Sequence, residues 1–161
     1  MKTPQRRVTI AALLLAPTLT ACGFSVQTDQ VYQAAVGVND RSGQVDILNA
    51  LIVSDEDGSG TFAGTLVNKS TTEDDRLESV TGEGITASRR TIEIPAGGIA
   101  TLAESGDVTL TGDAIEPGAY VTLTFAFSDG DSVTVSVPVV AAEGDYADVP
   151  LPSASSSADD E

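Results

Sequence analysis

The chain has 161 residues, with 24 Asp and Glu against 8 Lys and Arg, and its formal net charge is −16. This length fits one domain, and a hydrophobic fraction of 41% is typical of a folded protein. So acidic a chain is not expected to bind nucleic acid, because neutralising phosphates needs clustered Lys and Arg. With no His and a single Cys, the sequence excludes Ser-His-Asp catalysis, Cys-His catalysis and an internal disulfide. Carboxylates are plentiful enough for a glycosidase pair, but seven aromatic residues with no Trp make a poor platform for a sugar, so we expect that the protein is not an enzyme.

Residues 1–21 have the features of a signal peptide. Lys2, Arg6 and Arg7 give a positive start, and an uncharged, mostly apolar stretch follows from Val8 to Ala16. Such a stretch is too short to cross a hydrocarbon core about 30 Å thick, so it does not predict a transmembrane helix.

The end of this segment, Leu19-Thr20-Ala21-Cys22, resembles the bacterial lipobox. This resemblance implies that the signal is cleaved before Cys22 and that acyl chains on Cys22 anchor the protein in the cell membrane, on its extracytoplasmic face. The alternative is an ordinary secretory signal followed by an unpaired Cys. We favour the lipoprotein, because the single Cys of the chain stands at the lipobox position.

Residues 22–30 are mostly polar and predict a tether between the lipid and a folded domain. Residues 31–140 show the alternation of apolar and polar side chains that is typical of half-buried β-strands. The clearest case is Tyr120 to Phe127, which Ser128-Asp129-Gly130-Asp131 separates from a second alternating run, Val133 to Val139. Two such runs around Asp-Gly predict a hairpin. Pro138 cannot donate to a β-ladder, so the second strand is expected to be an edge or to end its pairing there.

Further short β-rich segments lie between turn formers, and no helical stripe follows the signal. Together they predict an all-β fold, an antiparallel sandwich or barrel over residues 31–140. Residues 141–161 predict an acidic, low-complexity tail, disordered from Pro150 onward. The expected strands are Val31 to Val38, Val45 to Val53, Phe62 to Val67, Leu77 to Val80, Thr91 to Ile94, Ile99 to Leu102 and Val108 to Leu110.

Three motifs in order resemble the periplasmic copper chaperones called PCu(A)C, or PCuAC. Asp75-Arg76-Leu77-Glu78-Ser79-Val80 resembles the family's D-R-L-x-x-V strand, and Ile94-Pro95-Ala96-Gly97-Gly98 matches its I-P-A-G-G turn. Glu116-Pro117-Gly118 through Val135 to Val139 resembles its closing L-K-P-G, T-L-T-F and V-x-V-P-V pattern. The resemblance implies a cupredoxin-like β-sandwich. With the lipobox, the chain also resembles the actinobacterial LpqE lipoproteins, which are similar to diverged members of that group.

The chemistry of that family does not transfer to these residues. The chaperones hold Cu(I) with His and Met, including an H-x-M element shortly after the I-P-A-G-G turn. The corresponding stretch here, Ser105 to Leu110, contains neither His nor Met. Cu(I) selects thiolate, thioether or imidazole ligands, and the expected mature chain offers only Cys22. We therefore assign no residue as a metal ligand and expect no cofactor.

Four polar segments could carry a site but are better explained as surface features. Asp55 to Gly60 resembles part of a calcium loop but lacks the distal Glu, and Glu73-Asp74-Asp75 has the character of a solvated turn. Asn68-Lys69-Ser70 matches a glycosylation sequon, which a bacterial lipobox makes irrelevant. Arg89-Arg90 could grip a carboxylate or phosphate, although protection of an edge strand is the favoured role.

The sequence therefore predicts a lipid-anchored envelope β-sandwich that acts as a non-catalytic interaction or structural module, with an unidentified envelope protein as partner. The alternative is a metal-handling protein, either a relative of the copper chaperones or a weak binder of hard cations. A large negative field could attract basic partners or cations, but net charge alone identifies neither.

Overall fold

A computed structural model describes residues 36–152, apart from residues 56–57, 89 and 103–105. These residues belong to one compact unit, Ala34–Glu161. The predicted signal peptide, the tether and the lipobox residues Leu19, Thr20, Ala21 and Cys22 lie outside the described part. Within the described part, no helix is long and apolar enough to cross a membrane.

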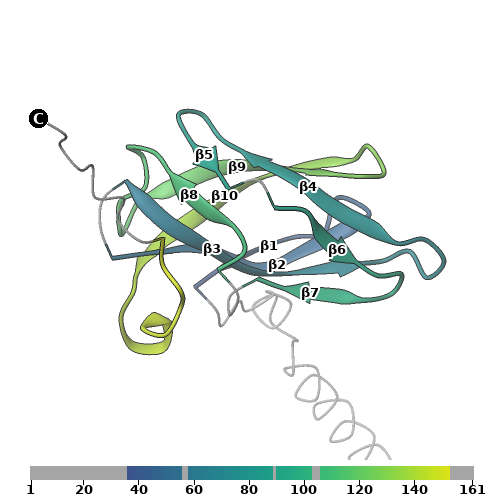
Figure 1. Cartoon of the computed structure of the whole chain (residues 1–161), viewed down its shortest axis with the longest axis horizontal. Coiled ribbons are helices and arrows are strands. Elements are labelled where there is room, and N and C mark those ends of the chain that lie inside the picture. The colour runs from purple at the N-terminus through teal and green to yellow at the C-terminus, as the bar shows by residue number, and fades with distance from the viewer. Residues whose placement is uncertain (1–35, 56–57, 89, 103–105, 153–161) are drawn as a thin grey trace, which may run out of the picture. The chain divides into compact units, whose positions relative to one another are not determined.

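The described unit is nearly all β, as the alternation predicts (Figure 1). Each predicted strand that falls wholly in it is present, with ends that shift by a few residues, and the two-residue β5 was not predicted. The predicted strand Val31 to Val38 lies mostly outside the described part, where β1 begins only at Val38. The elements are β1 (Val38–Asp40), β2 (Val45–Ser54), β3 (Ser59–Asn68), β4 (Asp75–Thr81), β5 (Thr86–Ala87), β6 (Ile92–Ile94), β7 (Ile99–Thr101), β8 (Thr109–Thr111), β9 (Tyr120–Phe127), β10 (Ser132–Ala141) and the short 3-10 helix η3 (Gly144–Tyr146).

The strands form two layers that β10 connects. Their order along the hydrogen-bonded path is β5-β8-β3-β2-β10-β9-β4-β6, while β1 pairs with β2 and β7 pairs with β3. Nearly all neighbours are antiparallel, and the exception is β10 with β2, which run parallel. The sheet is therefore a mixed one that curls on itself into a cupredoxin-like sandwich, rather than the purely antiparallel sandwich that the sequence predicted.

Pro138 marks the place where β10 changes partner. From Ser132 to Pro138 this strand pairs with β9, and from Val139 to Ala141 it pairs with β2. Because proline has no N–H to donate, it suits a position where one ladder ends and another begins. The predicted hairpin around Asp129-Gly130 is confirmed, with Gly130 at a φ of 92° in its turn.

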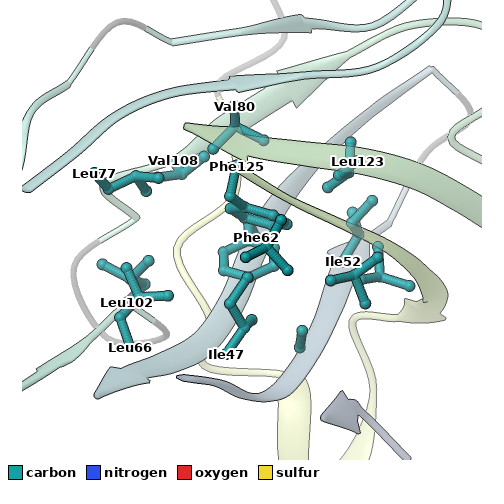
Figure 2. Close-up of a cluster of buried hydrophobic side chains, with 14 of the residues drawn as sticks. Ile47, Ile52, Phe62, Leu66, Leu77, Val80, Leu102, Val108, Leu123 and Phe125 are labelled. Carbon is teal, nitrogen blue, oxygen red and sulfur yellow. The ribbon is translucent and has the colours of Figure 1, made fainter. Parts of the chain in front are cut away.

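The core lies between the two layers and contains the alternate residues of the long strands (Figure 2). Phe62 from β3 and Phe125 from β9 meet in its middle, and both are fully buried. Leu123 is buried on the same face of β9, as predicted. The other labelled members in Figure 2 are Ile47, Ile52, Leu66, Leu77, Val80, Leu102 and Val108.

A bulge in β2 gives this strand buried side chains on both faces. Its register with β3 shifts between Leu48 and Leu51, and Asn49 has a φ of 51°. Residues after the bulge alternate in the opposite phase, so Ile52 joins the main core while Leu51 and Val53 join a second cluster on the other face. Other residues must cover this second face, because the Leu51 and Val53 side chains on it are fully buried.

Residues 142–151 provide this cover, and we name them the C-terminal strap. Tyr146, Val149 and Leu151 pack against the cluster of Leu51, Val53 and Ala63, together with Val140 and Ala142. The strap contains η3 and is fastened at its end, where the Oγ1 hydroxyl of Thr61 donates a hydrogen bond of 2.6 Å to the carbonyl oxygen of Pro150. The tail predicted for residues 141–161 therefore begins too early. The sequence prediction missed this packing because the segment has only three large apolar side chains among acidic and small residues.

Candidate functional site

The stretch that the resemblance to copper chaperones places at an H-x-M element leads into β8. Among its described residues, Val108 and Leu110 are buried in the core, while Thr109 is partly exposed. β8 lies between the first residues of β3 and the short β5, and pairs with both. Position 107 is thus held at the surface beside the end of β5.

Asp107 forms an ion pair with Arg90, which joins the stretch before β8 to the segment after β5. The Arg90 side chain is 63% exposed and that of Asp107 is 21% exposed. Ser88 strengthens the junction, since its Oγ hydroxyl donates to the carbonyl oxygen of Asp107 at 3.3 Å and accepts from the N–H of Thr109 at 3.0 Å. We name Ser88, Arg90, Asp107 and Thr109 the β5–β8 junction.

A cavity of about 550 Å³ opens next to this junction, between β4 and the segment from Ile85 to Thr91. Its lining includes Glu78, Ser88 and Arg90. These side chains offer carboxylate, hydroxyl and guanidinium groups. None of them is a soft donor, so the β5–β8 junction does not fit Cu(I).

Of the predicted basic pair, Arg90 is accounted for by this ion pair, and residue 89 lies outside the described part. The pair was expected to grip an anion or to protect an edge strand. In the structure Arg90 pairs with a carboxylate of its own chain, shortly after the edge strand β5. The sequence offers no signal for this pairing, because the two partners are 17 positions apart and come together only through the β5–β8 ladder.

The loop from Lys69 to Asp74 is organised by Asn68, the first residue of the apparent sequon. Asn68 is 2% exposed, and its side-chain amide donates to the carbonyl oxygens of Glu73 and Ile94 at 2.8 and 3.2 Å. Its Oδ1 accepts a hydrogen bond from the N–H of Ser70 at 2.9 Å. A side chain so buried and so fully bonded is a structural one and cannot be glycosylated in the folded state.

The predicted solvated turn Glu73-Asp74-Asp75 divides into two parts. Glu73 and Asp74 are exposed, as expected, whereas Asp75 is 4% exposed and begins β4. The Oδ1 atom of Asp75 accepts hydrogen bonds from the N–H of Arg76 and from both the N–H and the Oγ hydroxyl of Ser128. Burial of Asp75 was not foreseen, because a run of three acids is typical of a solvated face.

The segment from Asp55 to Gly60 connects β2 to β3, as the hairpin interpretation predicts. Residues 56–57 lie outside the described part, so the calcium-loop alternative is not tested by side-chain positions. Among the residues that are described, no three Asp or Glu side chains come together in a group that could hold a metal ion.

Comparison with solved structures identifies the fold. The described unit is similar to the copper-bound PCuAC domain from PmoF2, with a TM-score of 0.54 and 19% identity over 65% of this chain and 98% of that one. It is also similar to the apo PCuAC domain from PmoF1, with a TM-score of 0.55 and 19% identity over 65% of this chain and 99% of that one. The apo PmoF2 PCuAC domain gives a TM-score of 0.54 at 19% identity, over 66% and 98% of the two chains.

Neither a family model nor a curated protein sequence matches this chain. The structural likeness confirms that the chain has the fold of PCuAC domains, as its motifs predicted. At this level of identity the likeness establishes the fold alone, and the site must be argued from the residues that are present.

Proposed function

We propose that this protein is a lipid-anchored binding domain of the cell envelope, which uses the PCuAC fold to hold a protein partner and catalyses no reaction. The lipobox and the preceding short apolar stretch support an anchor at Cys22 and a position on the extracytoplasmic face of the cell membrane. The absence of His from the whole sequence supports a role without acid–base or nucleophilic catalysis.

The observation that favours this proposal over the handling of a metal ion is the ion pair between Arg90 and Asp107. The stretch that would hold soft donors in a copper chaperone instead holds a carboxylate, and a guanidinium of the same chain neutralises it. A cation that bound the Asp107 carboxylate would have to displace the Arg90 guanidinium. The β5–β8 junction is therefore built as a structural contact.

A second candidate function is the handling of copper, and the similarity to PCuAC domains, one of them copper-bound, favours it. Copper would then be cargo, held by oxygen donors and without the thioether or imidazole ligands that Cu(I) prefers. Carboxylates bind Cu(II) but discriminate poorly between it and Ca²⁺ or Mg²⁺. The residues described here fit such a role poorly, because no three acidic side chains among them are grouped.

A competition titration distinguishes the two functions. The full chain with Cys22→Ala, purified in neutral detergent, is titrated into a Cu(I) complex of a chromogenic chelator. We expect the chelator to keep its copper, whereas stoichiometric transfer to the protein would overturn the binding-domain proposal in favour of copper handling. Crosslinking in intact membranes, with the unmodified protein, then identifies the partner. If no crosslinked partner is recovered in repeated experiments, the proposal also fails.

A further inference from the structure

A second cavity, of about 510 Å³, lies at the far end of β3 from the β5–β8 junction. The junction flanks the start of β3, and the cavity adjoins Asn68 at its end, so at about 3.3 Å per residue the two are roughly 20 Å apart. The loop from Lys69 to Asp74 forms one wall, and the turn between β9 and β10 contributes another. Five carboxylates line this acidic cavity: Glu73, Asp74, Asp75, Asp129 and Asp131.

One basic side chain also lines the acidic cavity, but it is directed to a carboxylate outside the cavity. The Nζ atom of Lys69 lies 3.1 Å from Oδ1 of Asp46, a buried carboxylate that also pairs with Arg41 at 3.0 Å. Arg41, Lys69 and Asp46 together carry one net positive charge, which leaves most of the charge of the five carboxylates without a counter-charge. Their mutual repulsion favours a cation from outside the chain.

Asp75 gives the acidic cavity an unpaired acceptor. Its Oδ1 atom accepts three hydrogen bonds, from Arg76 and Ser128, whereas its Oδ2 atom is buried and has no partner among the described residues. An acceptor that is buried without a donor costs about 1–3 kcal/mol, and more when it is charged. Asp75 lines the cavity, so a small rotation of its carboxylate would bring the buried Oδ2 atom to an N–H donor that enters the cavity, and would relieve this cost.

Backbone hydrogen bonds hold the loop from Lys69 to Asp74 in position, together with the Asp74 carboxylate. The Oδ1 atom of Asp74 accepts a hydrogen bond of 2.9 Å from the N–H of Ala96, and the N–H of Gly97 donates to the carbonyl oxygen of Ser70 at 2.6 Å. Asn68 fixes the same loop through Glu73. A ligand of the acidic cavity would thus find this loop and the Asp74 carboxylate already ordered, which lowers the entropy cost of binding.

The spacing of these acceptors favours an organic cation over a metal ion. A bound Ca²⁺ ion needs six to eight oxygen atoms within about 2.6 Å, and no three acidic side chains of the described part are grouped in that way. A guanidinium carries five N–H donors on a planar fork, so it can contact carboxylates that are several ångströms apart. Charge-assisted hydrogen bonds of this kind are about twice as strong as neutral ones.

We infer that the acidic cavity is the docking site for an arginine side chain on a basic segment of a partner protein, and that Asp75 Oδ2 accepts one of its N–H groups. This inference rests on the proposed binding function and names the chemistry of the partner. The turn residues Asp129 and Asp131 and the exposed Glu73 provide the surrounding negative field, which makes the contact sensitive to salt.

The test is a binding titration of the full chain in neutral detergent with a fluorescein-labelled peptide that carries three arginines separated by Gly and Ser. Anisotropy gives the dissociation constant, and a peptide with citrulline in place of arginine provides a neutral ligand of the same shape. Two site variants are compared, Asp75→Asn and Glu73→Gln. The Glu73 side chain is exposed and forms no hydrogen bond or ion pair within the described part of the chain, so Glu73→Gln is expected to fold normally. Asp113→Asn, an exposed acid in the loop between β8 and β9, is the matched control.

We expect the arginine peptide to bind and the citrulline peptide not to bind. Glu73→Gln and Asp75→Asn should each weaken binding by at least about fivefold, which corresponds to about 1 kcal/mol, while Asp113→Asn should change it less than about twofold. Equal weakening by all three variants would mean that net charge alone attracts the peptide, and would overturn the inference. Displacement of the peptide by stoichiometric Ca²⁺ would assign the cavity to a metal ion instead. Neither result would contradict the proposed function. The crosslinking experiment tests that function separately, because it can recover a protein partner whether or not an arginine is bound.

Discussion

Phe62 and Phe125 join the two layers of the sandwich through their rings. The ring centroids lie 5.1 Å apart and the ring planes are inclined at 55°, with one ring contributed by β3 and the other by β9 (Figure 2). Tilted aromatic pairs at this separation add about 0.5–1.5 kcal/mol to the effect of burial. These two strands belong to different layers, so the contact fixes how the layers pack.

Truncation of this pair should be costly. We expect Phe125→Ala to lower the free energy of unfolding by about 3–5 kcal/mol, because it removes the ring contact and leaves a cavity in the middle of the core. Urea unfolding of the full chain, followed by circular dichroism, measures the loss.

Thr124→Ala, at the neighbouring position of β9, is the control for this prediction. The Thr124 side chain points away from the core and shares a hydrogen bond of 2.9 Å with Thr134 on β10. Its removal should cost less than about 1 kcal/mol. Equal losses from the two variants would contradict the assignment of the buried face of β9.

The sequence predicts the strands and their buried faces well, because alternation records burial directly. Leu123 and Phe125 lie on the predicted face, and Pro138 ends one ladder as its missing N–H requires. Sequence reasoning failed where pairing is decided by distant residues. The bulge at Asn49 reverses the alternation of β2, and only the folded sheet shows that Leu51 and Val53 need a cover.

The candidate site was predicted only in part. The resemblance located the stretch before β8 and the residue inventory excluded soft ligands, but the partner of Asp107 could not be predicted, since Arg90 reaches it across a β-ladder. The burial of Asp75 could not be predicted for the same reason, because it involves a contact between distant residues. Its burial depends on Ser128 at the end of β9, which is 53 residues further along the chain.

The C-terminal strap should contribute to stability. A chain that ends at Ala141 loses the contacts of Tyr146, Val149 and Leu151, and so exposes Leu51 and Val53 to water. We expect a loss of at least about 2 kcal/mol in the free energy of unfolding, together with new binding of a dye that reports apolar surface. A chain that ends at Pro152 keeps every contact described here and is the control. Equal stability of the two truncated chains would show that the strap does not contribute.

Acylation of Cys22 is a separate prediction, because it depends on the N-terminal sequence and not on the sandwich. Cys22→Ala should accumulate as a precursor that is neither cleaved nor acylated, since the lipobox needs a thiol to carry the lipid. Intact mass and membrane fractionation measure this outcome, and Ser25→Ala, which leaves the lipobox unchanged, serves as the control. If Cys22→Ala matures normally and stays in the membrane, the anchor lies elsewhere.

The last prediction is that the protein binds Cu(I) weakly because it lacks soft donor atoms, and not because of its fold. Asp107→His combined with Thr109→Met introduces an H-x-M element at the surface before and within β8, where Asp107 and Thr109 are only partly buried. The guanidinium of Arg90 beside the new imidazole favours the neutral form of the His, which is the form that binds a metal.

This double variant should take Cu(I) from a chromogenic chelator at least about tenfold more tightly than the unchanged chain, a difference of about 1.4 kcal/mol. The variant Asp107→Asn with Thr109→Leu breaks the same ion pair and fills a similar volume without a soft donor, so it should show no gain. Both proteins carry Cys22→Ala, so that thiol chemistry does not contribute. If the two variants behave alike, the geometry of the β5–β8 junction, and not its donor set, prevents copper binding.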